Sequence, residues 1–133
     1  MSLFIDTSVF SLAWRRDRVP DIPEVVRFAQ ALDSGEEIFT TGVVLQELLQ
    51  GFAGAKAKAA ITSRFEAIGL IVPTRADHVA AATLRNQCQR SGIQIGTIDA
   101  LLAQLCISRA LLILSADRDF VKIAEQSSLR VWK

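Results

Sequence analysis

Four carboxylates stand in or beside apolar segments of this 133-residue chain, where acidic side chains are not expected. Asp6 ends a short apolar run and Asp117 follows another, while Glu47 and Asp99 lie inside apolar helical patterns. A buried carboxylate without a partner is costly or becomes protonated, and no lysine or arginine lies within one helical turn of Glu47 or Asp99. We therefore expect a bound cation, and Mg²⁺ or Mn²⁺ suits carboxylate oxygens best.

Each acid taken singly also has an ordinary structural interpretation. Asp99 fits the start of a helix, and Asp6 or Asp117 fits a helix N-cap. The two cysteines have no Cys or His at metal-ligand spacing, so we expect core thiols and no zinc site. The single histidine, His78, is expected at the start of a helix and receives no catalytic role.

The elements that must position these acids alternate between strand and helix along the chain. We expect strands at residues 3–5, 37–41, 70–72, 111–114 and 129–132. Three helices are expected to begin after an N-cap: one after Thr7 or Ser8, one after Thr74 or Asp77 that ends at about 90, and one after Thr97 that ends at 107. Four further helices are expected over residues 25–32, from 43 to about 51, over 55–68 and over 117–126. This alternation indicates an α/β fold with a parallel sheet covered on both faces. Asp6 and Asp117 would then lie at the carboxyl ends of strands, where such sheets bind ligands.

Size and composition indicate one soluble domain over residues 1–133. No apolar stretch approaches the roughly 20 residues of a membrane-spanning helix, and the N-terminus does not resemble a secretion signal, so we expect a cytoplasmic protein without membrane contact. The net charge is only +1, from 15 basic and 14 acidic residues. If four acids hold metal, 10 acidic residues remain against those 15 basic ones, a residual of +5 that is compatible with phosphate binding.

Four segments, in order, resemble the motifs of PIN-domain nucleases, and in particular those of VapC-type toxins. They are Leu-Phe-Ile-Asp-Thr-Ser-Val-Phe at residues 3–10, Leu-Gln-Glu-Leu at 45–48, Gly-Ile-Gln-Ile-Gly-Thr-Ile-Asp-Ala-Leu-Leu-Ala at 92–103 and Leu-Ser-Ala-Asp-Arg-Asp-Phe at 114–120. The resemblance covers nearly the whole chain and implies a three-layer α/β/α PIN-like fold with a central, mostly parallel sheet.

The resemblance also implies roles for particular residues. The family's four acidic metal-site positions match Asp6, Glu47, Asp99 and Asp117. Small hydroxyl positions beside these acids, which would orient carboxylates or water, match Thr7 or Ser8 and Ser115, although the family often has Thr at the last. Asp119 fits either an outer acid of the site or the start of a helix, and we favour the helix start.

What the resemblance implies for function is hydrolysis of RNA phosphodiester bonds by a water activated by Mg²⁺ or Mn²⁺. Such toxins typically act as homodimers and are silenced by an antitoxin whose C-terminal segment covers the active-site groove. For RNA contacts the sequence offers only candidates, each of which also fits a solvated surface: Arg15, Arg16, Arg18, Lys56, Lys58 and Arg118. Trp14 fits base stacking, but packing against Phe10 or a dimer neighbour is the favoured interpretation.

Two other functions remain open. Asp6 at the end of a first strand also suits a covalent aspartyl-phosphate nucleophile. However, Ser8 stands where that chemistry usually has a second aspartate, and no lysine occurs between Lys58 and Lys122. A non-catalytic PIN-like module that only binds RNA or a partner is the other alternative, although it gives no reason to keep repelling carboxylates together.

Overall fold

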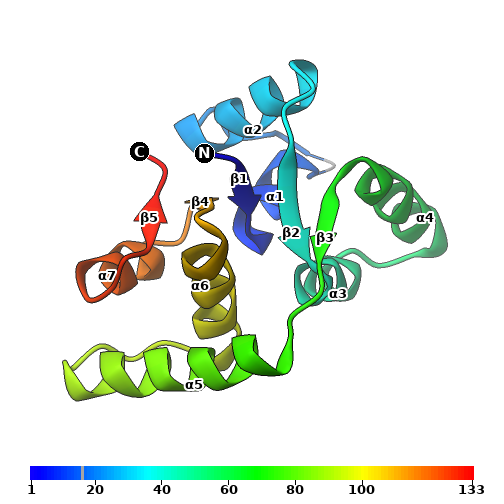
Figure 1. The fold of residues 1–133 in the computed structure, drawn as a ribbon. Coiled ribbons are helices and arrows are strands. Elements are labelled where there is room, and N and C mark those ends of the chain that lie inside the picture. The colour runs from blue at the N-terminus through cyan, green and yellow to red at the C-terminus, as the bar shows by residue number, and fades with distance from the viewer. Residues whose placement is uncertain (16) are drawn as a thin grey trace.

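The computed structural model describes residues 1–15 and 17–133. At its centre is a five-stranded sheet in the order β3-β2-β1-β4-β5 (Figure 1). The strands are β1 (Leu3–Ile5), β2 (Ile38–Thr41), β3 (Gly69–Ile71), β4 (Leu112–Leu114) and β5 (Arg130–Val131). All four neighbouring pairs are parallel, as expected for strands joined by helical crossovers.

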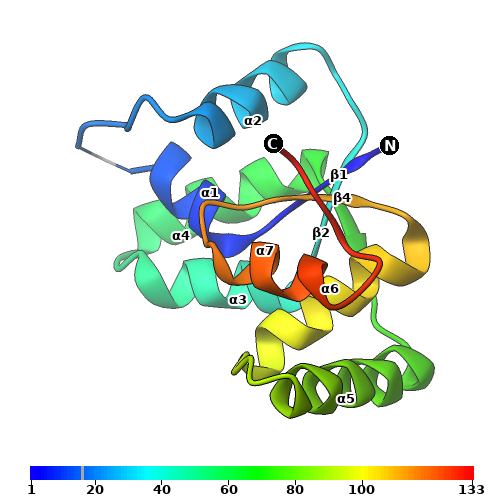
Figure 2. The ribbon, with the colours of Figure 1, turned by 90° about the vertical axis from the view of Figure 1, so that its left-hand side faces the viewer.

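Helices cover both faces of this sheet. They are α1 (Thr7–Ala13), α2 (Pro23–Asp33), α3 (Gly42–Gly51), α4 (Ala55–Arg64), α5 (Arg75–Arg90), α6 (Thr97–Arg109) and α7 (Asp119–Glu125), with a 3₁₀ turn η1 (Phe65–Ala67) after α4. Right-handed crossovers in this strand order place α1 to α4 on one face and α5 to α7 on the other. The contacts agree, because α1 packs on α2 and α3, whereas α6 packs on α5 and α7 (Figure 1 and Figure 2). The predicted three-layer α/β/α fold is confirmed.

The core explains why the central strands are apolar throughout. Every residue of β1 is buried, since this strand has a neighbour on each side and helices on both faces. On the buried side of α1, the ring of Phe10 packs against three other aromatic rings. The distances between ring centroids are 5.0 Å to Trp14, 5.2 Å to Phe28 and 5.0 Å to Phe65. Trp14 therefore packs against Phe10, which was the favoured interpretation of the sequence. The predicted core thiols are also confirmed, because both cysteines are buried.

Two helix caps differ from the expected ones. The N-cap of α1 is neither Thr7 nor Ser8 but Asp6, whose Oδ1 accepts a hydrogen bond from the backbone N–H of Val9 at 3.4 Å, so the N-cap interpretation of this acid is confirmed. The N-cap of α6 is Gly96, and Thr97 is the first helical residue. At α5 the cap is Thr74, one of the two expected choices, in a reciprocal capping box.

Two helix lengths also differ. The helix expected over 55–68 ends at Arg64, and the chain continues as the tighter turn η1. The last helix begins at Asp119 rather than at Asp117, because Asp117 lies in the turn and its Oδ1 accepts from the backbone N–H of Asp119 at 2.9 Å. No helix among the described residues is long and apolar enough to cross a membrane.

Candidate active site

The carboxyl edge of the sheet collects the acids from separate segments. Asp6 directly follows β1 and its backbone N–H donates to the carbonyl of Leu114, at the end of neighbouring β4, at 3.3 Å. Residues 115–117 leave β4 at the same edge. Helix α3, which carries Glu47, starts directly after β2, and α6 runs back toward β4, so its first turn with Asp99 also belongs to this edge.

Asp6 is the most enclosed of these acids, with only 4% of its surface exposed. The hydroxyl of Ser8 donates to its Oδ1 at 2.6 Å and that of Ser115 donates to its Oδ2 at 2.7 Å. Burial raises the pKa of Asp6, while these hydroxyl bonds oppose that rise because they stabilise the charged form. The carboxylate is thus held in one orientation from two elements far apart in sequence.

Glu47 is held by a different hydroxyl. The side chain of Thr7 donates to Oε1 of Glu47 at 2.6 Å, and both residues are half-buried. Since Thr7 starts α1 and Glu47 lies in the middle of α3, this bond joins the two helices at the site.

Three further carboxylates lie together beside α6 and α7. One oxygen from each of Asp99, Asp117 and Asp119 lies within 4.8 Å of the others. Asp99 and Asp119 are half-buried and Asp117 is exposed. Asp119 also lies 3.7 Å from the ammonium of Lys122, an exposed pair one turn apart that contributes little stability.

The electrostatics of Asp99 join this group to the other acids. The pKa of Asp99 is raised to about 6, first by burial and then by the negative charges of Asp117, Asp119, Asp6 and Glu47. The structure therefore brings two of the four predicted acids, Asp99 and Asp117, together with Asp119. Asp6 and Glu47 lie outside that group of carboxylates, although their charges act on Asp99. Like charges this close repel one another unless a cation lies between them.

The donor set fits a hard divalent cation. Carboxylate oxygens predominate, hydroxyl groups orient two of the carboxylates, and neither histidine nor cysteine takes part among the described residues. Mg²⁺ and Mn²⁺ prefer such oxygens, whereas zinc sites usually contain His or Cys.

The comparison with known families agrees with this architecture. The profile of the PIN domain matches residues 3–126. The chain belongs to the PIN domain family. The membership predicted from the four sequence motifs is confirmed.

Solved structures share the fold of this PIN domain at low sequence identity. VapBC-1 from nontypeable Haemophilus influenzae matches with a TM-score of 0.76 and 19% identity, covering 100% of this chain and 98% of the other. FitAcB from Neisseria gonorrhoeae matches at 0.74 and 19%, covering 98% and 96%. VapBC2 from Rickettsia felis, bound to a DNA fragment from its promoter, matches at 0.75 and 20%, covering 100% of both chains. No curated protein sequence matches the chain significantly.

The candidate RNA contacts are distributed unevenly around this PIN domain. Arg118 is exposed directly beside Asp117. Arg15 pairs with Asp17 at 3.0 Å, and it lies with Arg18 beyond the far end of α1, which leads away from Asp6. Lys56 and Lys58 are exposed on α4, and Arg16 lies outside the described residues.

Asp119 is the residue whose part in the acid cluster the sequence left ambiguous. It does start α7, as the favoured interpretation states, but its carboxylate also lies with those of Asp99 and Asp117. The alternation Asp117-Arg118-Asp119 is a signal for this, because a turn before a helix can direct two acids spaced by one residue toward the same point.

Proposed function

We propose that this PIN domain is a Mg²⁺- or Mn²⁺-dependent endoribonuclease and the toxin of a toxin–antitoxin pair. The observation that supports this most strongly is the convergence of Asp99, Asp117 and Asp119 within 4.8 Å beside the fixed carboxylate of Asp6. A scaffold with no cation to bind would gain nothing from this repulsion.

In this proposal Asp6, Glu47, Asp99 and Asp117 hold the metal, and Asp119 contributes an outer carboxylate. When bound, the divalent cation supplies a nucleophile at neutral pH and offsets the charge that develops on the phosphate during RNA hydrolysis. The protein's own part is to fix the acids: Ser8 and Ser115 orient Asp6, and Thr7 orients Glu47. Because the pKa of Asp99 is about 6, its carboxyl group loses its proton before it can serve as a ligand.

The geometry weighs against an aspartyl-phosphate mechanism. A nucleophilic carboxylate must be free to turn onto the line of attack at phosphorus, whereas Ser8 and Ser115 hold both oxygens of Asp6 in one orientation, which suits a metal ligand better. Ser8, which replaces the second aspartate of that chemistry, is one of the two donors.

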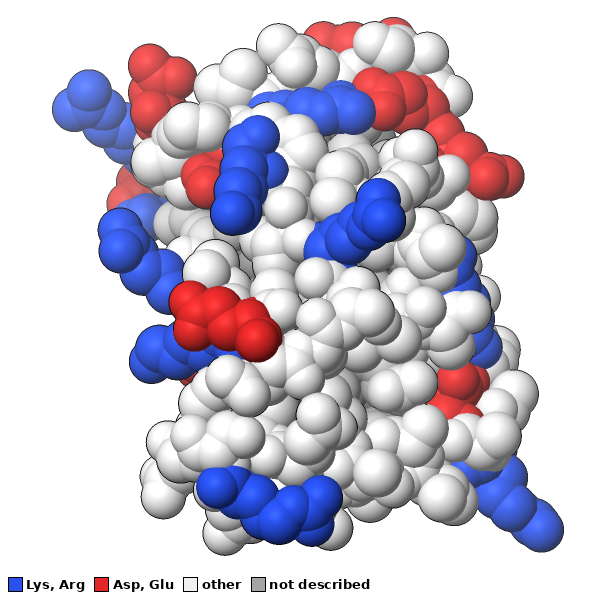
Figure 3. All heavy atoms as spheres, turned by 60° about the vertical axis from the view of Figure 1, so that its left-hand side comes forward, with Lys and Arg blue, Asp and Glu red and all other residues white. Residues whose placement is uncertain are grey.

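On the face shown in Figure 3, lysine and arginine side chains are scattered among acidic and neutral ones and form no continuous basic surface. We therefore propose that the RNA is positioned by a small number of local contacts, Arg118 among them, rather than by a broad basic surface. We also propose a cognate antitoxin, which the fold shared with the VapBC and FitAcB structures supports. The resemblance to VapC-type toxins supports a homodimer and action in the cytoplasm. Residues 1–133 would work as one nuclease domain.

The experiment is cleavage of a labelled RNA pool by the purified chain with Mg²⁺, with Mn²⁺ and with EDTA. We expect cleavage only with a divalent cation, and at least a hundredfold lower rate for Asp99→Asn while its circular dichroism spectrum is unchanged. Asp33→Asn removes an exposed acid at the end of α2 and should cleave like the wild type. Undiminished cleavage by Asp99→Asn refutes the site, and RNA binding without cleavage in any metal favours the binding module.

The toxin role has a separate test. Expression of the chain alone should arrest growth, and coexpression with the adjacent open reading frame should relieve the arrest. Arrest that persists equally with Asp99→Asn would show that growth inhibition does not come from hydrolysis.

A further inference from the structure

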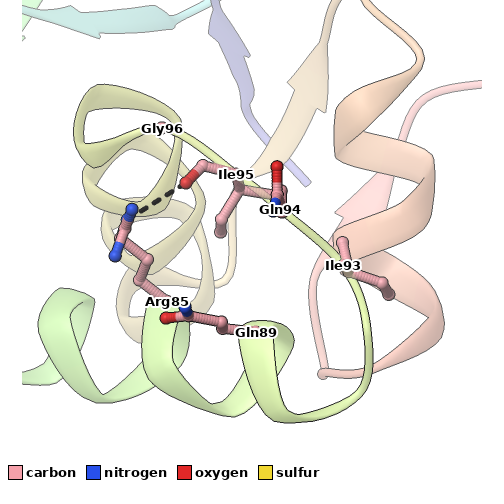
Figure 4. Close-up of a pocket in the computed structure, with 6 residues that line it drawn as sticks. All are labelled: Arg85, Gln89, Ile93, Gln94, Ile95 and Gly96. Atoms are coloured by element: carbon pink, nitrogen blue, oxygen red, sulfur yellow. Dashed lines mark hydrogen bonds between the residues drawn. The ribbon is translucent and has the colours of Figure 1, made fainter.

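A pocket of about 380 Å³ lies between the second half of α5 and the segment that leads into α6 (Figure 4). Its lining residues are Arg85, Gln89, Ile93, Gln94, Ile95 and Gly96. None of them belongs to the acid cluster. The volume falls in the range of small-ligand sites, and the lining combines one cation, two amides and two branched apolar side chains.

One hydrogen bond fixes the side chain of Arg85 in this pocket, and no neighbouring carboxylate in the described part of the chain neutralises its positive charge. Its Nε donates to the backbone carbonyl of Ile95 at 3.1 Å, so the guanidinium is directed at the segment before α6 (Figure 4). The described residues provide no carboxylate within ion-pair distance of it. The outer nitrogens of the guanidinium therefore remain free for an anion, for which its planar fork is well suited.

The pocket adjoins the acid cluster through the first turn of α6. Gly96 is the N-cap of α6 and Asp99 is its third residue, so the two lie on the same side of the helix, about one turn apart. A strand of nucleic acid that runs from the acids past the N-terminus of α6 would therefore reach the pocket.

The remaining lining residues suit a base better than a second phosphate. Gln89 and Gln94 are exposed amides, each able to donate and accept hydrogen bonds at the edge of a base. Gln89 lies one turn after Arg85 on α5, and the half-buried Ile93 adds apolar surface against which a base can pack. Ile95 is buried in the core and contributes its backbone carbonyl to Arg85. Proteins read single-stranded RNA by this combination of base-edge hydrogen bonds and packing on the base face.

We infer that the pocket binds one nucleotide of single-stranded RNA beside the phosphate that is cut, with Arg85 on a backbone phosphate and Gln89 and Gln94 at the base. This assignment rests on the proposed function for the nature of the substrate and adds a positioning site to it.

The test measures binding of a short fluorescein-labelled single-stranded RNA of mixed sequence by anisotropy in EDTA, where hydrolysis is absent. Arg85→Gln should weaken binding about tenfold, the range expected for an arginine that contacts nucleic acid. It should also reduce the slope of log Kd against log salt concentration by about 0.7, the value for one lost phosphate contact on a single strand.

Two variants separate this role from a structural one. Arg85→Lys keeps the charge but changes the fork that binds Ile95, so it should retain the wild-type salt slope. Arg90→Gln removes an exposed cation from the last turn of the same helix, outside the pocket, and should leave affinity and slope unchanged. Binding of Mn²⁺, followed by electron paramagnetic resonance, should be equal in all four proteins and reports an intact acid cluster.

The outcomes distinguish this inference from the proposed function. Wild-type affinity and slope in Arg85→Gln overturn the pocket assignment and leave the nuclease proposal standing. RNA binding that depends on Arg85 in a protein that cleaves nothing supports the pocket and removes the nuclease. An equal reduction of the salt slope in Arg85→Gln and Arg90→Gln shows a diffuse charge effect and overturns the assignment. Absence of RNA binding by the wild type also overturns it.

Discussion

The hydroxyl of Thr7 donates a hydrogen bond of 2.6 Å to Oε1 of Glu47, so that the first residue of α1 fixes an acid in the middle of α3. Glu47 has a longer and more flexible side chain than the aspartates around it. A single strong hydrogen bond to a carboxylate limits the rotamers of that side chain and so restricts where its second oxygen can lie. The geometry of the proposed metal site therefore depends on a residue that holds no metal itself.

Replacement of this hydroxyl should weaken the site without unfolding the protein. We expect Thr7→Val to lower the cleavage rate about 10–100-fold and to raise the Mg²⁺ concentration for half-maximal activity, as is typical for residues that orient metal ligands. Thr7→Ser keeps the donor and should stay close to the wild type. The measurement is the cleavage rate of the three proteins as a function of Mg²⁺ concentration. Equal titration curves for Thr7→Val and the wild type would refute the orienting role.

The negative charge of Asp99 should lower the stability of the metal-free folded protein at neutral pH. Burial and four neighbouring negative charges raise its pKa to about 6, which means that its charged form is disfavoured in the folded state. We expect Asp99→Asn to increase the free energy of unfolding in EDTA at pH 7.5 by about 1–2 kcal/mol, less than the full shift because the group is half-buried. Mg²⁺ should stabilise the wild type and should stabilise this variant much less. Urea unfolding of both proteins with and without Mg²⁺ makes the measurement.

The same residue gives the metal-free protein a pH dependence of defined sign. The carboxyl of Asp99 binds its proton more tightly in the folded chain, with a pKa of about 6 against 3.8 when unperturbed. Its contribution to stability is therefore lost as the pH rises from about 4 to about 6, and it stays constant above that range. The difference in unfolding free energy between wild type and Asp99→Asn should follow this curve. A difference that does not change across that interval would contradict the assigned pKa.

A second buried carboxylate should behave in the opposite way. Asp77 accepts hydrogen bonds from Arg109 at 3.1 and 2.9 Å and from the backbone of Thr74 at 2.8 Å. Arg109 is the main cause of the lowered pKa of Asp77, so this stabilisation is present above pH 3.8 and is lost as the pH falls further.

The Asp77–Arg109 pair links the start of α5 to the end of α6, and its strength can be measured directly. We expect Asp77→Asn to cost about 1.5–3 kcal/mol at pH 7, the range for hydrogen bonds to charged groups. A double-mutant cycle with Arg109→Gln should give a coupling energy of about 1 kcal/mol or more. Additive losses would show that the two side chains do not stabilise each other.

Much of the fold was predictable because its central strands are buried on both faces. Continuous apolar runs such as residues 3–5 and 112–114, separated by helical patterns, leave few arrangements other than a parallel sheet. The same reasoning located the acids, since Asp6 and Asp117 follow strands that must end at one edge.

The pairing of side chains within the site was not predictable from spacing. Thr7 and Ser8 are adjacent, yet one donates to Glu47 and the other to Asp6, because successive residues at a helix start point in different directions. The place of Asp119 depends on the turn at Asp117, which delays α7 by two residues. Arg85 carries no sequence signal at all, since an arginine on an exposed helix face usually means only solvation.

The hydrogen bond between Ser115 and Asp6 joins residues 109 positions apart. Asp6 follows β1 and Ser115 follows β4, so the Ser115 hydroxyl reaches this carboxylate only once the two strands have paired. Contacts between segments this distant in sequence form late in folding, because the long loop between them must close first. A partly folded chain in which β4 is still unpaired therefore lacks the fixed orientation of Asp6 on which the proposed metal site depends.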